Sequence, residues 1–143
     1  MPHAPKEQFL EVAKQILACE AALIQEGEVN APDAFRACDK LRVQLRKIFG
    51  SGGFRPLLHR ALVLASAEIP WLCKLQMTAD GALDGFAELP SDLDRSILAE
   101  GEIALIAELL GLLVTFIGPA LTLSLVQEIW PALENLKLEN GTL

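Results

Sequence analysis

Hydrophobic positions recur at helical spacing along the first third of the chain. Between positions 6 and 26 they fall three or four residues apart, with charged side chains on the other faces, which predicts an amphipathic helix. A second helix is expected to open within positions 30–33, where Pro32 and Asp33 suit a first turn, and to run to about Phe49. The buried positions expected in these two helices are Phe9, Ala13, Ile16, Leu17, Ile24, Phe35, Cys38, Leu41, Leu45, Ile48 and Phe49.

Glycine and proline divide the rest of the chain into further helices. A glycine-rich turn at 50–53 ends the second helix, and a third is expected from about Arg55 until Pro70 ends it. The stretch 103–126 carries one charge, Glu108, and is long enough to span a bilayer. Gly118 and Pro119 interrupt it, and a lipid-facing glutamate is costly. We therefore expect two packed helices, over about 99–117 and 119–130, rather than a membrane segment.

The periodicity changes between positions 71 and 86. Side chains alternate in character from Trp71 to Thr78, and Asp80 with Gly81 forms a tight-turn dipeptide. This pattern predicts a short two-stranded hairpin that packs on the helices. Together the patterns predict a mainly α, single-domain helical bundle of about five helices with a small two-stranded β-hairpin insertion. The domain is expected to occupy 1–143, with a short flexible N-terminus over 1–5 and a flexible tail over 135–143.

Composition indicates an ordered protein with apolar surface to cover. Of the 143 residues, 52% are hydrophobic and 22% are charged. The chain therefore has more apolar surface than it needs to avoid disorder. Cys19, Cys38 and Cys73 are too few for a disulfide framework and are expected to pack as small hydrophobic residues. The N-terminal residues contain no apolar stretch typical of a secretory signal, so we expect a cytoplasmic protein of bacterial type.

Charge is distributed unevenly along the chain. The net charge is −7, yet positions 36–60 hold seven of the twelve basic residues and a single acid, Asp39. This basic segment has three interpretations. It could pair with acidic parts of the same chain or of a second copy, bind an acidic protein partner, or bind nucleic acid. Nucleic acid is disfavoured because no exposed aromatic platform accompanies the charges. The candidate binding residues are Arg36, Lys40, Lys47, Gly52, Gly53, Arg55 and Arg60.

The glycine-rich turn supports an alternative function. Gly52 and Gly53 precede a helix, where free N–H groups and the helix dipole favour an anion, and Arg55 and Lys47 are close in sequence. An anion- or nucleotide-sensing domain is therefore an alternative, although the patterns of P-loops and dinucleotide-binding turns are absent. The competing interpretation is a helix cap followed by a connector.

His59 supports a second alternative. It is expected on a helix beside Arg60, as in histidine phosphotransfer proteins, but the Lys-Gly pair usual after such a histidine is replaced by Leu62 and Val63. Glu108 is a candidate buried carboxylate, because its neighbours are apolar.

No arrangement typical of a catalytic site accompanies these features. The sequence lacks metal-ligand spacing, a nucleophile motif and a second histidine within the helical region. We therefore expect a non-enzymatic protein without metal or cofactor. Its expected role is that of a regulatory or adaptor module that binds an acidic protein face or self-associates as a homo-oligomer, with Trp71 and Trp130 as anchors and a small anion as the alternative ligand.

Overall fold

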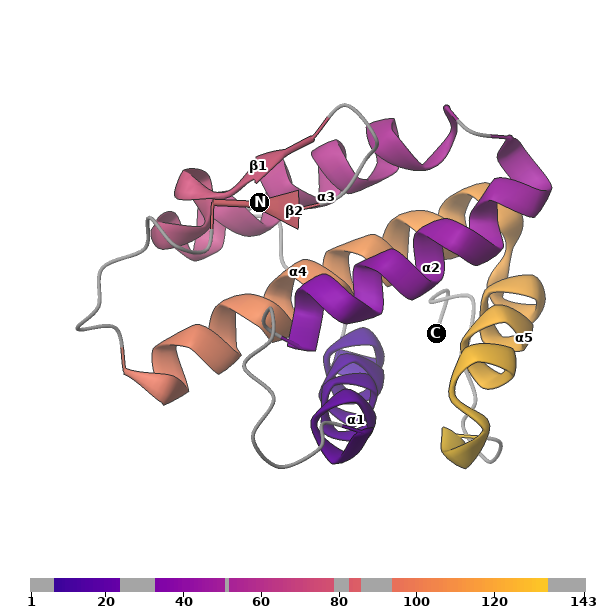
Figure 1. Cartoon of the computed structure of the whole chain (residues 1–143), viewed down its shortest axis with the longest axis horizontal. Helices are drawn as coiled ribbons and strands as arrows, with labels where there is room; N and C mark the ends of the chain where they lie inside the picture. The colour runs from indigo at the N-terminus through magenta and orange to yellow at the C-terminus, as the bar shows by residue number, and fades with distance from the viewer. Residues whose placement is uncertain (1–6, 24–32, 51, 79–82, 86–93, 134–143) are drawn as a thin grey trace.

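The chain folds into five α-helices and a small two-stranded sheet within the residues that a computed structural model describes, namely 7–23, 33–50, 52–78, 83–85 and 94–133 (Figure 1). The mainly α fold with a β-hairpin is therefore confirmed. The expected flexible ends and the Asp80-Gly81 turn lie outside the described residues. The elements are α1 (Glu7–Leu23), α2 (Asp33–Phe49), α3 (Phe54–Glu68), η1 (Pro70–Lys74), β1 (Gln76–Met77), β2 (Leu83–Asp84), α4 (Arg95–Ile117), α5 (Pro119–Ile129) and η3 (Pro131–Leu133).

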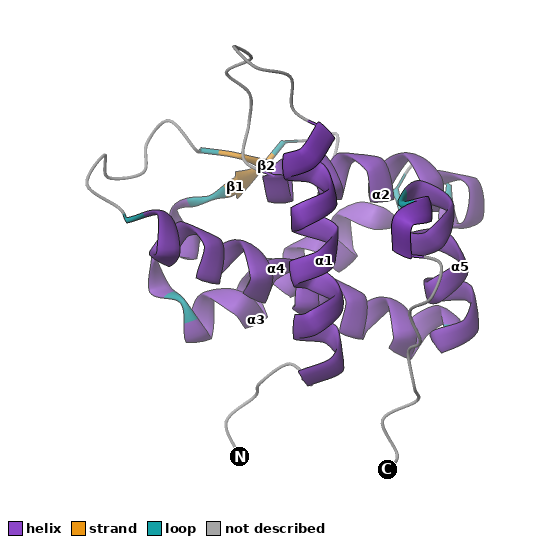
Figure 2. Ribbon diagram, turned by 90° about the horizontal axis from the view of Figure 1, so that it is seen from below, coloured by secondary structure: helices purple, strands orange, loops and turns teal. Residues whose placement is uncertain are grey.

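Helix α4 forms the centre of the fold. It contacts α1, α2, α3 and α5, and every residue from 104 to 110 is buried. Figure 1 shows α3 and α2 along α4, and Figure 2 shows α1 crossing it. Because α4 is covered on all sides from 104 to 110, this part of the helix needs no polar face, which explains its apolar sequence.

Both ends of α4 are set by local chemistry. The Asp94 carboxylate accepts a hydrogen bond from the Ser96 N–H at 3.3 Å, a typical N-cap. At the other end Gly118 has φ +86°, a conformation that glycine adopts without strain, and Pro119 begins α5 at once. The expected division of the apolar stretch into two helices is confirmed. No helix within the described ranges is long and apolar enough to cross a membrane.

The hairpin is shorter than the alternating pattern predicts. β1 and β2 pair antiparallel, with Gln76 opposite Asp84 and Met77 opposite Leu83. The preceding residues, Pro70–Lys74, form the 3₁₀ helix η1 instead of a strand. The prediction of a strand from Trp71 was wrong because Pro70 favours a helical turn there and Leu72 and Leu75 both reach the core.

The buried stripe of α2 ends earlier than expected. Leu41 and Leu45 are fully buried, whereas Ile48 and Phe49 remain 43% and 37% exposed. Their positions continue the helical period, but the C-terminal turn of α2 leaves their side chains in contact with solvent. The prediction that both residues are buried was therefore wrong. Periodicity identified the face correctly and could not show where the neighbouring helices stop covering it.

Two glycines of α4 provide a test of packing. A Cβ atom at Gly101 would lie 2.3 Å from the Trp71 ring, whereas one at Gly111 would lie 3.6 Å from Phe9. We expect Gly101→Ala to lower the free energy of unfolding by about 1–3 kcal/mol, because the indole must move. Gly111→Ala should instead raise it by about 0.5–1 kcal/mol through helix propensity. Urea denaturation measures both, and equal effects of the two substitutions would contradict this account.

Candidate functional site

A buried carboxylate joins three helices at one end of the bundle. Glu20 of α1 is fully buried. Its Oε1 lies 3.4 Å from Nε of Arg36, and its Oε2 lies 2.6 Å from Nζ of Lys40. The indole Nε1 of Trp130, at the end of α5, donates to the same Oε2 at 2.7 Å. We call Glu20, Arg36, Lys40 and Trp130 the Glu20 cluster.

Helical spacing places these groups. Glu20 continues the buried stripe of α1 one turn after Ile16. Arg36 and Lys40 are four residues apart and share one side of α2. Both cations keep contact with solvent, since their side chains are 21% and 39% exposed, whereas the Glu20 side chain is 1% exposed. The carboxylate is thus held inside by cations that enter from the surface, as buried charges require.

Two of the candidate binding residues therefore have an internal role. Arg36 and Lys40 pair with Glu20, which corresponds to intramolecular pairing with the first helix. Trp130 is only 2% exposed, so the expectation that it anchors a partner was wrong. Its indole instead fills the interior and satisfies the carboxylate. Glu20 was not among the predicted site residues, although a charged residue on an apolar helical stripe was the signal that could have revealed it.

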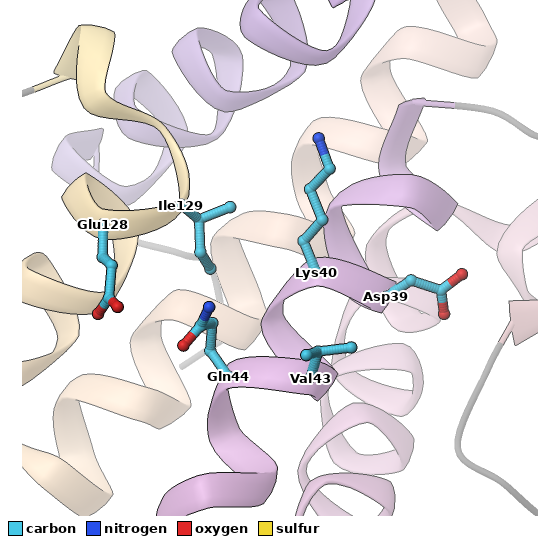
Figure 3. A pocket seen from close by; sticks show the side chains of 6 residues that line it. All are labelled: Asp39, Lys40, Val43, Gln44, Glu128 and Ile129. Carbon is cyan, nitrogen blue, oxygen red and sulfur yellow. The ribbon is translucent and has the colours of Figure 1, made fainter.

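A groove runs beside the Glu20 cluster, between α2 and α5. Its volume is about 420 Å³. In Figure 3, Gln44 and Ile129 lie between the two helices, and Asp39 lies on the far side of α2. The lining thus combines apolar, cationic and acidic side chains. We call this site the α2–α5 groove; its lining residues are Asp39, Lys40, Val43, Gln44, Glu128 and Ile129.

The outer face of α2 combines an apolar side chain with positive charge. Val43 is 51% exposed, and Lys47 follows it by one turn. Lys47 contacts Gln44 at 3.3 Å, and Asp39 is bridged to Arg42 at 3.5 Å. Among the described residues, no carboxylate lies within ion-pair distance of Arg46 or Lys47. Within the described ranges, the charge of these two cations is therefore unmatched.

The candidate anion site is placed around the turn between α2 and α3. Gly53 packs so closely on Phe49 that an added Cβ would lie 2.2 Å from the phenylalanine Cβ. Gly52 has open space around it. Arg55 points elsewhere, because its Nε donates to the Thr78 carbonyl at 3.5 Å. Steric packing thus explains Gly53 without a ligand.

His59 and Arg60 are exposed on α3. His59 lines a second groove of about 400 Å³ between α3, η1 and β1, together with Arg55, Ser66 and Cys73. An exposed imidazole is accessible to phosphorylation, so the structure is compatible with the phosphotransfer hypothesis and does not test it.

Glu108 is buried, with 4% of its surface exposed. It lines a cavity of about 290 Å³ between α1, α3 and α4, which also contacts Lys14, Glu68 and Glu100. The cation of this lining, Lys14, comes from α1. No group of three or more metal-ligating side chains occurs in the described part of the chain.

The three cysteines occupy different environments. Cys38 is buried, Cys19 is half-buried and Cys73 is exposed, so the expectation of a core position was wrong for Cys73. Burial raises the pKa of the Cys38 thiol above its usual range, and the Asp39 and Glu102 carboxylates raise it further. A protonated, buried thiol is a poor nucleophile.

Comparison with known proteins adds no functional assignment. No protein-family model matches the chain, and no curated protein or solved structure is significantly similar to it.

Glu20 should matter more than an exposed glutamate of the same helix. We expect Glu20→Gln to lower the free energy of unfolding by about 1–3 kcal/mol, because it removes the negative charge that pairs with Arg36 and Lys40 and weakens the hydrogen bond from Trp130. Glu11→Gln, at an exposed position of α1, should change it by less than about 0.5 kcal/mol. Urea denaturation measures both variants. Equal stability of Glu20→Gln and the unsubstituted protein would show that the cluster contributes nothing.

Thiol reactivity should follow burial. We expect an alkylating reagent to modify Cys73 in the folded protein and Cys38 only after denaturation, because the Cys38 thiol is inaccessible and protonated. Peptide mapping by mass spectrometry identifies the modified sites, and Cys73→Ser should remove the fast-reacting one. Alkylation of native Cys38 as fast as Cys73 would contradict the described burial.

Proposed function

We propose that this protein is a non-catalytic regulatory or adaptor module of the bacterial cytoplasm that acts by binding a protein with an acidic face. The observation that carries the proposal is the outer face of α2. There Val43 is half exposed, and Arg46 and Lys47 have no ion-pair partner among the described residues. Protein interfaces combine an apolar contact, which contributes affinity, with charged residues beside it, which orient the partner.

Internal pairing narrows the part of the basic segment that serves this function. Arg36 and Lys40 are engaged by Glu20, and Arg42 is engaged by Asp39. The remaining cations of α2 lie toward its C-terminal half, on the same side as the exposed Val43. Attraction to an acidic surface would therefore be strongest around Val43, Arg46 and Lys47.

The anion-sensing alternative has weaker support. Gly53 is accounted for by its packing on Phe49, and the arginine nearest to that turn is directed to the hairpin. A helix N-terminus without a converging cation is a weak anion site. The α2 surface offers both apolar area and unmatched charge, so we place the function there.

Site-specific photocrosslinking tests the proposal. A photoreactive amino acid is placed at Val43 and, as a matched control, at Val63 of α3, which is 48% exposed. We expect a discrete crosslinked product from position 43 in cells, absent from position 63 and lost when Arg46→Glu and Lys47→Glu are introduced. The mass of the product distinguishes a second copy of this chain from another protein. Equal products, or none, from the two positions would overturn the proposal.

A further inference from the structure

The α2–α5 groove has the chemical pattern of a helix-binding site. Apolar atoms come from both walls, with Val43 on α2 and Ile129 on α5. Polar groups border them, with Lys40 and Gln44 on one wall and Glu128 on the other. Amphipathic helices bind grooves of this kind by laying one apolar edge between two helices and keeping their charged edges at the rim.

The charges of the two walls differ and define the orientation of a bound segment. The α2 wall carries Lys40, and Arg46 and Lys47 lie about two turns further along the same helix, outside the groove lining. Asp39, the acid of that wall, is offset by its bridge to Arg42. The α5 wall carries Glu128. A complementary segment therefore has carboxylates along the edge that faces α2 and none along the edge that faces α5.

We propose that the α2–α5 groove binds an amphipathic helical segment of a partner protein, with aliphatic side chains between Val43 and Ile129. Its carboxylates pair with Lys40 and Lys47. This inference rests on the proposed function and specifies the kind of partner that the α2 surface accepts.

The Glu20 cluster connects this groove to an internal reporter. Nζ of Lys40 lies 2.6 Å from Oε2 of Glu20, the oxygen that also accepts the Trp130 indole N–H. Trp130 directly follows Ile129, which lines the groove. The Lys40 side chain is 39% exposed, so a carboxylate in the groove reaches the same ammonium group. Occupation of the groove thus changes the surroundings of the Trp130 indole.

Trp130 fluorescence provides the binding experiment. The chain has two tryptophans, so Trp71→Phe leaves Trp130 as the sole tryptophan emitter. The probe is a designed peptide of about four helical turns with leucines at i and i+4 and glutamates along one flanking edge. The matched probe has lysines in place of those glutamates. We expect a saturable change in Trp130 emission with the acidic peptide, and binding of the basic peptide at least about tenfold weaker.

Paired variants test the location of the site. We expect Val43→Asp to weaken binding of the acidic peptide at least about tenfold, because it places a carboxylate between the apolar walls. Val63→Asp, at a valine of similar exposure on α3, should leave binding unchanged. Lys47→Glu should weaken binding, and Arg60→Glu on α3 should not. Circular dichroism and urea denaturation of each variant exclude loss of folding as the cause of weaker binding.

Several results would overturn this inference. Absence of saturable binding, equal binding of the two peptides, or equal effects of the Val43 and Val63 substitutions would each do so. Light scattering that shows a dimer which Val43→Asp converts to a monomer would assign the groove to a second copy instead. If position 43 still crosslinks to a protein while the acidic peptide does not bind, the helix-in-groove mode is wrong and the proposed function stands. Failure of both experiments refutes both.

Discussion

A carboxylate without access to water must be matched by positive charge and hydrogen-bond donors, and Glu20 imposes this requirement on the whole bundle. The requirement is met from two directions, by the cations of α2 and by the indole at the end of α5. Each donor fixes the position of its own helix relative to α1. Apolar packing around α4 holds the helices together but tolerates small shifts. The directional contacts to Glu20 define the positions of the helices.

The same contacts determine what the surface of α2 can offer. A row of basic residues in the sequence suggests one continuous positive face, but two of its members, Arg36 and Lys40, pair with the buried Glu20. What remains for another molecule is a smaller area centred on Val43, beside the groove formed with α5. Lys40 belongs to both regions, because it contacts the buried carboxylate and lines the groove. The interior and the proposed binding surface are thus linked through one side chain.

The helical content of the fold follows from local sequence rules, and the candidate site does not. The spacing of Phe9, Ile16 and Leu41, and the Gly118-Pro119 break, were sufficient to predict the helices because those signals act within a few residues. The groove depends on Gln44 and Ile129 coming together from helices far apart in the chain. No local pattern encodes that approach. Glu20 was detectable in principle, as a charge on an apolar stripe, but its partners became identifiable only when the helix positions were known.

The separation of Glu20 from its partners along the chain has a consequence for the order of folding. Arg36 and Lys40 follow Glu20 by 16 and 20 positions, whereas Trp130 follows it by 110. Short loops close at a lower entropic cost than long ones, and N-terminal segments leave the ribosome first. The first two helices can therefore neutralise the carboxylate early, and the indole arrives only after the first four helices have been made.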